Sequence, residues 1–475
     1  MILALLLAAT FSRPLERVSS IDPFEAQSGY DARVVGLLYE TPLAIDYAAR
    51  PYRLVPGYCQ LPEVSADGRV YRLAVGADPR CAEDVVRTLT RLKDPTGPNG
   101  WLVQDVESVK ALSPKLVEIR LKRPVDYFPW LLACAGAAVR AADGGGTGPY
   151  RLAHWRKNHE MVFKRKTPDA AGFDTIRYLV IDDLSTQWLM FLRGELDFLG
   201  EVSRDNWDMI ATKDGTIQPS LAAKGIALHS FPALESPYIG FNMKDPVVGT
   251  NKKLRQALNC AFDYPAWEAF YNGRIAESTG PLPPGVEGRI DAPLPYRFDL
   301  ARAKRLLAEA GYAEGIDPKT GRRLVLTLAI GRPDQSSREM GELLASFYDK
   351  IGIKLELAFM TWDAYLTAVN EGRVQMYYLI WVMDYPHAQN ILQLFYGPNR
   401  SPGVNHSNYE NAAYDAAYRA GDYRLCQEIL REDCPWIFTH YRKDSTLTGP
   451  RVGNYIPSDF PYGIESFFKY RKEER

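Results

Sequence analysis

The sequence lacks the features that mark several broad classes of protein. Within the chain, no apolar stretch approaches the roughly 18 residues that a membrane-spanning helix needs. Lys and Arg (57) balance Asp and Glu (58), so the formal net charge of −1 offers no basic surface for a nucleic-acid backbone. The apolar content of 46% and the charged content of 24% are ordinary, which excludes disordered and collagen-like chains. What remains is a globular chain of 475 residues, enough for about two or three domains.

Motifs for catalysis and for metal binding are missing as well. The chain contains no G-x-x-x-x-G-K-[ST], no H-E-x-x-H and no G-x-S-x-G, which phosphate-binding loops, zinc proteases and serine hydrolases use. Its six His include no helical i,i+4 pair, and its six Cys include no C-x-x-C. We therefore expect a protein that is not an enzyme, with no cofactor and no metal site.

The cysteines leave two possibilities open. In an exported chain some of them could form disulfides, and the pairs closest in sequence are Cys59–Cys81 and Cys426–Cys434. The spacing does not determine the connectivity, and plain buried thiols are the alternative.

The N-terminal eleven residues, MILALLLAATF, form an apolar run that is followed by Ser12-Arg13-Pro14. The run is too short to span a bilayer and lacks the basic region that opens a complete secretory signal. We interpret residues 1–11 as the apolar part of a signal peptide whose start is clipped or misassigned; a buried first strand is the alternative. No Cys follows the run, so a lipid anchor is not predicted.

Helical and strand patterns alternate most clearly between Asp299 and Pro386. Asp299 is a good N-cap for a helix that ends at Gly311, and the continuous apolar run at 324–330 has the length of a strand covered on both faces. Alternation of this kind predicts βαβ units and a largely parallel sheet. The further elements predicted here are a helix from about Ser337 to Gly352, a strand at 353–359, a helix from Thr361 or Asp363, and a strand at 374–381.

Three other regions differ in pattern. A shorter α/β region is predicted from a strand at 176–181, a helix at 185–192 and a strand at 197–199. Between the two α/β regions, the aromatic segment 231–242 resembles a crossing between lobes. The stretch 41–145, with a turn at Asp67-Gly68 and one helix from about Ala82, predicts a satellite domain.

One carboxylate occupies a position typical of a ligand site. Asp384 follows Trp381 by three residues, at the carboxyl end of a strand predicted to be buried in a parallel sheet. Ligands of open α/β sheets bind outside those strand ends. A carboxylate there can accept charge-assisted hydrogen bonds from an α-ammonium, and the indole offers a flat apolar wall and a cation–π face. A turn-capping role for Asp384 is the alternative.

Several segments, in order along the chain, resemble the extracytoplasmic solute-binding proteins of peptide ABC importers, the dipeptide/oligopeptide-binding proteins of family 5. Each motif is weak alone, but together they span nearly the whole chain. The segments are Ser20-Ile-Asp-Pro23 with Leu38-Tyr-Glu40, Val64-Ser-Ala-Asp-Gly68 with Tyr71, Ala82-Glu-Asp-Val-Val86, Gly146-Thr-Gly-Pro-Tyr150 with Trp155, Gly194-Glu-Leu-Asp197, Phe241-Asn242 with Leu254-Arg-Gln-Ala257 and Ala261-Phe-Asp263, Ala303-Lys-Arg-Leu-Leu307 to Gly311-Tyr312, and Trp381 to Pro386.

The resemblance implies an α/β, two-lobed periplasmic-binding-protein-like fold that closes over its ligand by hinge bending, with a small α+β domain inserted in lobe I. On that pattern, lobe I comprises 12–40, 146–235 and 440–475, the insert is 41–145, and lobe II is 236–439. The insert is short, because the loop between Val75 and Ala82 is reduced and the domain runs abruptly from Cys134 through the glycines into Gly146. A short insert could open the cleft or change which partner docks.

The resemblance also implies a function and a set of contacts. A monomeric binding protein, periplasmic or otherwise extracytoplasmic, would capture short peptides and deliver them to ABC permease subunits in the membrane. The role of the aspartate that holds the ligand's α-ammonium falls on Asp384. The contacts implied beside it are Trp381 as a wall, the backbone of Val382 and Met383 as an added-strand edge, Tyr385, and from lobe I Gln27 and Gly29.

Two alternatives stay open within this fold. The ligand could be a nickel chelate, another metallophore or a sugar, in which case His387 and His440 become candidate contacts and Asp384 loses its ammonium partner. The same lobes could also serve a cytoplasmic ligand sensor, which would need an effector domain. Fold alone does not choose between these ligands.

Overall fold

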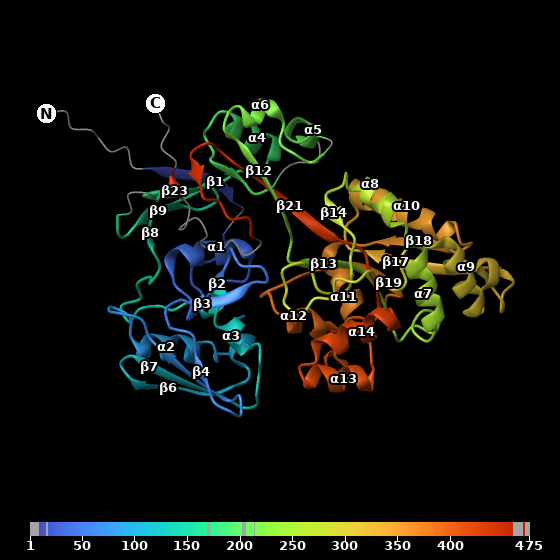
Figure 1. Cartoon of the computed structure of the whole chain (residues 1–475), viewed down its shortest axis with the longest axis horizontal. Helices are drawn as coiled ribbons and strands as arrows, with labels where there is room; N and C mark the ends of the chain where they lie inside the picture. Colours follow the sequence, from blue (N-terminus) through green and yellow to red (C-terminus); the bar gives the residue numbers. More distant parts are fainter. Residues whose placement is uncertain are drawn as a thin grey trace. The chain divides into compact units, whose positions relative to one another are not determined.

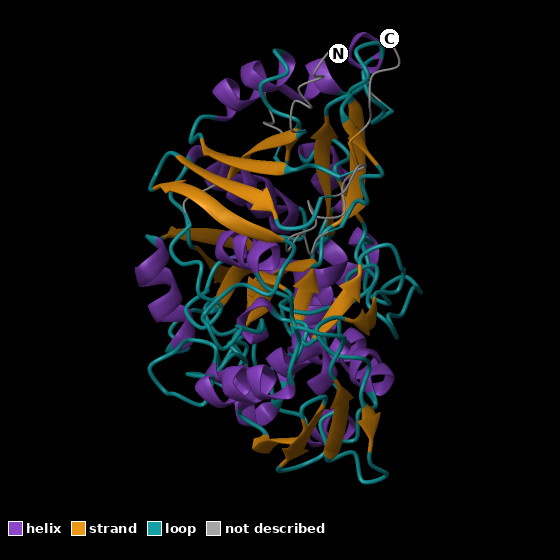
Figure 2. Ribbon diagram, turned by 90° about the vertical axis from the view of Figure 1, so that its left-hand side faces the viewer, coloured by secondary structure: helices purple, strands orange, loops and turns teal. Residues whose placement is uncertain are grey.

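The computed structural model shows two compact units, each built from helices and strands (Figures 1 and 2). Unit 1 comprises Met1–Phe231 and Asp444–Arg475, and unit 2 comprises Pro232–Lys443. The structure describes residues 9–15, 18–168, 172–201, 206–212, 214–458 and, for the backbone, 469–470. The chain passes between the units at 231/232 and 443/444, a few residues from the lobe borders expected at 235/236 and 439/440. Among the described helices, none is long and apolar enough to cross a membrane.

The body of unit 1 contains a four-stranded sheet in the order β1-β10-β9-β8. Strand β1 pairs in parallel with β10, and β9 pairs antiparallel with both β10 and β8. Phe11, at the end of the N-terminal apolar run, is fully buried in β1 and packs edge-on against Phe173. Thr10 and Phe11 are therefore part of the folded sheet, while residues 1–8 of the expected signal segment lie outside the described residues. The bounds are β1 Thr10–Leu15, β8 Tyr150–Arg156, β9 Glu160–Arg165, β10 Thr175–Val180 and α1 Gly29–Leu38.

A second sheet of unit 1, in the order β11-β21-β12, corrects the prediction of a second βαβ region. The strand, helix and strand expected at 176–199 are present, but β10 and β11 lie in different sheets. Asp197, just before β11, accepts a hydrogen bond from Ser12 N–H and forms an ion pair with Arg451. Strand β11 itself pairs antiparallel with β21, near the C-terminus. Contacts with distant segments thus decide where β11 pairs. The bounds are α4 Leu184–Leu192, β11 Phe198–Leu199, α5 Trp207–Ile210, α6 Pro219–Ala222, β12 Ala227–Pro232, β21 Tyr441–Thr448, β22 Val452–Gly453 and β23 Lys469–Tyr470.

The stretch predicted as a satellite domain forms an antiparallel sheet in the order β4-β5-β7-β6, with α2 beside β6 and β7 (Figure 1). The expected turn at Asp67-Gly68 connects β4 to β5. The Gly146-to-Tyr150 motif then returns the chain to the body of unit 1, where Gly148 N–H donates to Leu38 O at the end of α1. A Cβ on Gly148 would lie 2.6 Å from the Leu38 carbonyl carbon, so only glycine fits this approach. The bounds are β2 Leu43–Asp46, β3 Arg53–Pro56, β4 Glu63–Val64, β5 Val70–Ala74, α2 Ala82–Arg91, β6 Val106–Ser113, β7 Leu116–Leu121 and α3 Phe128–Leu131.

Unit 2 is organised around a five-stranded sheet in the order β18-β17-β19-β13-β20. The expected parallel arrangement holds for β17, β18 and β19, but β13 runs against both of its neighbours. The segment 231–242, predicted as a crossing, therefore also supplies this fully buried strand, which lies between β19 and β20. The bounds are β13 Glu235–Phe241, β14 Ile275–Ala276, β15 Ile316–Asp317, β16 Arg322–Arg323, β17 Val325–Ile330, β18 Lys354–Phe359, β19 Met376–Val382 and β20 Trp436–Phe438.

Most helices of unit 2 begin at a side chain that caps them, although α11 has no side-chain cap. Asp299 accepts from Arg302 N–H at the start of α9, as predicted, and Ala303, Leu306 and Leu307 face the core. Helix α10 begins at Gln335, two residues before the predicted Ser337, because Asp334 is the N-cap that accepts from Ser337 N–H. The bounds are α7 Lys252–Ala261, α8 Tyr264–Phe270, α9 Leu300–Glu309, α10 Gln335–Asp349, α11 Trp362–Asn370, α12 Ala388–Leu392, α13 Ala412–Arg419 and α14 Tyr423–Asp433.

All six cysteines are free thiols. The pairs Cys59–Cys81 and Cys426–Cys434 are not joined, and of these four only Cys81 is other than buried. Burial raises the pKa of the Cys59 and Cys426 thiols to about 12, which keeps them protonated and unreactive. Five of the six cysteines are thus buried thiols, the alternative to a disulfide framework, and Cys81 is partly exposed.

Candidate functional site

The carboxyl ends of three parallel strands, β18, β17 and β19, lie side by side at one edge of the sheet of unit 2. Asp384 comes just after β19, and Trp362 begins α11 shortly after β18. The β17–β19 ladder ends at Ile330↔Tyr378, whereas β19 continues to Val382, still paired with β13 on its other side. The last residues of β19, from 379 to 382, therefore extend past the end of β17. Their edge on that side lies close in sequence to the Asp384 carboxylate.

A hydrogen-bonded chain of three side chains holds Asp384. The indole Nε1 of Trp381 donates to Asn390 Oδ1 at 2.9 Å, and Asn390 Nδ2 donates to Asp384 Oδ2 at 3.1 Å. Asn390 lies in α12 and is 1% exposed, so its amide is fixed by packing as well as by its partners. The arrangement orients the carboxylate and the indole with respect to each other.

The electrostatic environment of Asp384 is unusual for a side chain that solvent reaches. The Asp384 residue is exposed, yet the dense protein around the carboxylate desolvates it and raises its pKa. The hydrogen bond from Asn390 partly opposes this rise. Accessible and at the same time partly desolvated, the carboxylate is placed to interact strongly with a cationic group that reaches it.

The neighbours of Asp384 in sequence point in different directions. Val382 is 62% exposed, whereas Met383 and Tyr385 are each 3% exposed. Met383 N–H donates to Leu234 O, which leaves this amide engaged within unit 2, and the Tyr385 hydroxyl donates to Gln389 Oε1. Within the set expected from sequence, Trp381, Val382 and Asp384 are thus the ones that unit 2 presents at this edge.

The two site residues expected from lobe I belong to unit 1. Gln27 and Gly29 are exposed on either side of Ser28, the N-cap of α1. The backbone N–H of Gln27 donates to Asp31, a fully buried carboxylate that also accepts from Ser19 N–H and Oγ. Burial raises the pKa of Asp31, but these hydrogen bonds outweigh burial and the pKa lies below its ordinary value. Asp31 therefore fixes the loop that presents Gln27.

Sequence reasoning missed two residues of this region. Asn390 gave no signal, because its role depends on α12 turning back toward the end of β19. Trp362 could have been noticed, since it follows the predicted strand 353–359 in the way that Asp384 follows the next one. The Trp362 side chain is 50% exposed and stacks on Tyr365, with ring centroids 5.7 Å apart. It adds a flat aromatic face at the same edge of the sheet.

The two histidines considered as contacts for a metal chelate, His387 and His440, both have structural roles. His440 is 2% exposed, and its Nδ1 accepts a hydrogen bond from Trp267 Nε1 at 3.1 Å, so it is a core residue and not an available ligand contact. His387 is the N-cap of α12 and accepts from Gln389 N–H. Across the described residues, no group of three His, Cys, Asp or Glu side chains is arranged to hold a metal ion.

A cavity of about 1410 Å³ lies within unit 1, and two segments of the satellite domain help to line it. Residues 77–80 form one part of its wall, and residues from Ala133 to Pro149 form another. Charged groups of both signs line it, among them the ion-paired Glu40 and Arg80. Open space therefore remains where the satellite domain meets the body of unit 1.

Comparison with known proteins gave matches over most of the chain. The family model of the bacterial extracellular solute-binding proteins, family 5 Middle, matches residues 54–403. Heme-binding protein A of Haemophilus influenzae is 27% identical over 68% of this chain, and the match spans 59% of that protein's length. The glutathione-binding protein GsiB of Escherichia coli is 24% identical over 88% of this chain and 86% of that protein.

Solved structures show the same fold. HbpA2 from Haemophilus parasuis has a TM-score of 0.84 at 22% identity, covering 98% of this chain and 100% of that one. NikA from Brucella suis, in complex with Fe(III)-EDTA, has a TM-score of 0.80 at 22% identity, covering 98% and 99%. DppA from Helicobacter pylori, in complex with the peptide STSA, has a TM-score of 0.74 at 20% identity, covering 98% of each chain.

Proposed function

The chain belongs to family 5 of the bacterial extracellular solute-binding proteins, and we propose that it captures short peptides and delivers them to the permease of an ABC importer. The observation that carries the proposal is the chain of hydrogen bonds from Trp381 through Asn390 to Asp384 at the carboxyl end of β19. Binding without chemistry needs only a shaped site and a fold that can close over it.

A peptide offers groups that match this edge of unit 2. Its α-ammonium would pair with the Asp384 carboxylate, whose raised pKa reflects an environment that favours a neutralising cation. Its main chain would lie along the part of β19 that extends past β17, as an added strand whose hydrogen bonds do not depend on the peptide's sequence. The indole of Trp381 would lie beside the ammonium as a cation–π face. Peptide-bound DppA and the glutathione-binding GsiB support a ligand of this class.

A second candidate is heme or another metal chelate. It is favoured by the match to heme-binding protein A and by the half-exposed indole of Trp362, a flat face for packing against a planar ligand. The buried ring of Tyr365 stacks on this indole and supports it. In that case Asp384 has no ammonium partner, and blocking a peptide's amine is irrelevant to binding.

Native mass spectrometry of the purified protein separates the two candidates. Adducts with a ladder of peptide masses support peptide capture and give the preferred length, whereas a single porphyrin or chelate mass supports the second candidate. Calorimetry with a peptide of that length, with its amine free or acetylated, then tests the role of the carboxylate.

The matched variants are Asp384→Asn and Asp349→Asn, a 70%-exposed aspartate at the end of α10. Asp384→Asn should weaken binding of the free-amine peptide by about 2–5 kcal/mol, and acetylation should cost the native protein a similar amount. The Asp349 variant should bind as the native protein does. Equal affinities for free and acetylated peptides would remove the proposed role of Asp384.

A further inference from the structure

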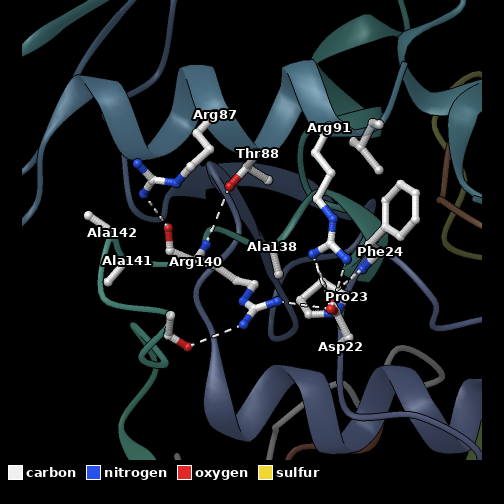
Figure 3. A pocket seen from close by; sticks show the side chains of 13 residues that line it. Asp22, Pro23, Phe24, Arg87, Thr88, Arg91, Ala138, Arg140, Ala141 and Ala142 are labelled. Carbon is white, nitrogen blue, oxygen red and sulfur yellow. Dashed lines mark hydrogen bonds and ion pairs between the residues drawn. The ribbon is translucent and has the colours of Figure 1, made fainter. Parts of the chain in front are cut away.

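A smaller cavity, of about 220 Å³, lies within unit 1 and away from the edge described above (Figure 3). Three segments form its walls: the Asp22-to-Phe24 loop before α1, one face of α2, and the segment from Gly136 to Gly144. The last of these segments comes just before the Gly146-to-Tyr150 motif that returns the chain to the body of unit 1.

Three guanidinium groups converge on this cavity. Arg87 and Arg91 lie one turn apart on α2, and Arg140 approaches from the opposite segment (Figure 3). Arg91 donates to both oxygens of Asp22 at 3.1–3.2 Å, and Arg140 Nη1 donates to Asp22 Oδ2 at 2.9 Å. Arg87 Nη2 donates to the backbone carbonyl of Arg140 at 3.1 Å.

The charges of the described lining residues do not cancel. Asp22 is the acidic side chain among them, against three arginines. Arg87 also pairs with Asp84, which precedes it by three residues on α2, is 4% exposed and accepts a hydrogen bond from the Tyr58 hydroxyl. Even with Asp84 counted, one positive charge remains in excess. Each guanidinium carries several N–H donors in a fixed fork, and the geometry suits a carboxylate or phosphate group.

Apart from the Thr88 hydroxyl, the remaining wall of the cavity is largely apolar. Phe24 lies under the Arg91 guanidinium, 4.3 Å from its carbon to the ring centroid, and Pro23, Ala138 and Ala141 complete the surface. An anion with a small carbon skeleton could thus place its charge between the arginines and its apolar part against Phe24 and Ala138.

We propose that this cavity binds a small organic anion, with a phosphate or carboxylate group held between Arg87 and Arg140. The site lies within unit 1 and is independent of the peptide proposal, because none of its residues belongs to unit 2. Phosphate esters and carboxylates share the recognised chemistry, and the test separates them.

The direct test is calorimetry with inorganic phosphate, phenyl phosphate and benzoate, at an ionic strength held constant with sodium chloride. We expect saturable binding, with phenyl phosphate at least threefold tighter than inorganic phosphate because its ring reaches the apolar wall. Arg87→Met and Arg140→Met should each weaken binding at least tenfold. The control is Arg177→Met in β10, which should leave binding unchanged. The Arg177 side chain is ion-paired and 44% exposed, which matches the 45% exposure of Arg87. Tighter binding of benzoate than of phenyl phosphate would assign the site to carboxylates.

A second measurement uses the native protein alone, in case the variants do not fold. Phenylglyoxal modifies accessible guanidinium groups, and peptide mass spectrometry locates the modified arginines. Phenyl phosphate should slow modification of Arg87 and Arg140 severalfold while leaving Arg177 unchanged. Equal rates at all three positions, with or without the anion, or an absence of saturable heat in the calorimetry, would overturn the proposal.

Discussion

The imidazole of His440 should make unit 2 lose stability in weak acid. The side chain is 2% exposed, and its Nδ1 accepts a hydrogen bond from Trp267 Nε1 at 3.1 Å. The Thr439 hydroxyl, which donates to Pro237 O, lies 3.1 Å from the same nitrogen. The ring of Tyr271 lies 5.0 Å away, centroid to centroid. Burial, reinforced by the positive charge of Arg442, lowers the pKa of His440 from its ordinary value of 6.5 to about 3. The folded state therefore holds this imidazole neutral.

The sign and size of the effect follow from proton linkage. Above pH 6.5 the imidazole is neutral in both the folded and the unfolded chain, so it adds no pH dependence. As the pH falls below that value, the unfolded chain takes up a proton that the folded chain refuses, and the free energy of unfolding falls by about 1.4 kcal/mol for each pH unit. Down to pH 3 the loss amounts to about 5 kcal/mol, a large part of a typical folding stability.

Urea unfolding of the native protein and of His440→Gln, followed by tryptophan fluorescence between pH 7.5 and 4.5, measures this loss. Glutamine can still accept the Trp267 hydrogen bond but does not titrate. We expect the variant's stability to depend less steeply on pH, so that the two proteins converge by about 3 kcal/mol at pH 4.5 relative to pH 7.5. His154→Gln, at a side chain that is 55% exposed, is the control. Parallel pH profiles for the native protein and His440→Gln would refute the reasoning.

Three further substitutions test packing, a buried acceptor and the site. Gly240→Ala places a Cβ 2.3 Å from a tyrosine ring in β19 and should cost about 1–3 kcal/mol of folding stability. The control, Gly29→Ala, places a Cβ with no atom within 4 Å and should change stability by less than about 0.5 kcal/mol. Thermal melts compare the two variants, and equal losses of stability would contradict the packing argument. Asp31→Asn should lower the free energy of unfolding, measured with urea at pH 7, by about 2–4 kcal/mol. Because the pKa of this carboxyl is lowered in the folded chain, the difference between variant and native protein should shrink as the pH falls below 3.8. A difference that stays constant with pH would show that the charge of Asp31 is not what stabilises the loop. Asn390→Ala should reduce calorimetric affinity for a free-amine peptide about tenfold by releasing the Asp384 carboxylate, and unchanged affinity would exclude this positioning role.

Elements with local signals were predictable from the sequence. The strand at 324–330 and the helix after Asp299 are confirmed by β17 and α9, because a continuous apolar run and an N-cap act within a few residues of themselves. The pairing of strands was less predictable. Strand β13 runs against its neighbours and β11 joins a sheet with β21, and both outcomes depend on segments about 140 to 250 residues away, which no local pattern encodes.

The site shows the same division. Asp384 could be proposed from the sequence because a carboxylate after a buried parallel strand is a local pattern with a known structural consequence. Asn390 was not, since it contacts Asp384 only after α12 has folded back. His440 looked like a candidate contact for a chelate because sequence shows a histidine but not its burial, and the structure encloses it in the core.

The carboxylates Asp31 and Asp384 are both desolvated by surrounding protein, but the balance of forces on them differs. At Asp31, hydrogen bonds from the backbone and side chain of the loop outweigh burial, so the pKa is lowered and the folded chain itself stabilises the charge. At Asp384, burial outweighs the amide of Asn390 and the pKa stays raised. A cation that arrives at Asp384 would therefore gain more than one that arrives at a carboxylate already stabilised by the chain. This difference separates a carboxylate that holds the fold together from one that is suited to hold a ligand.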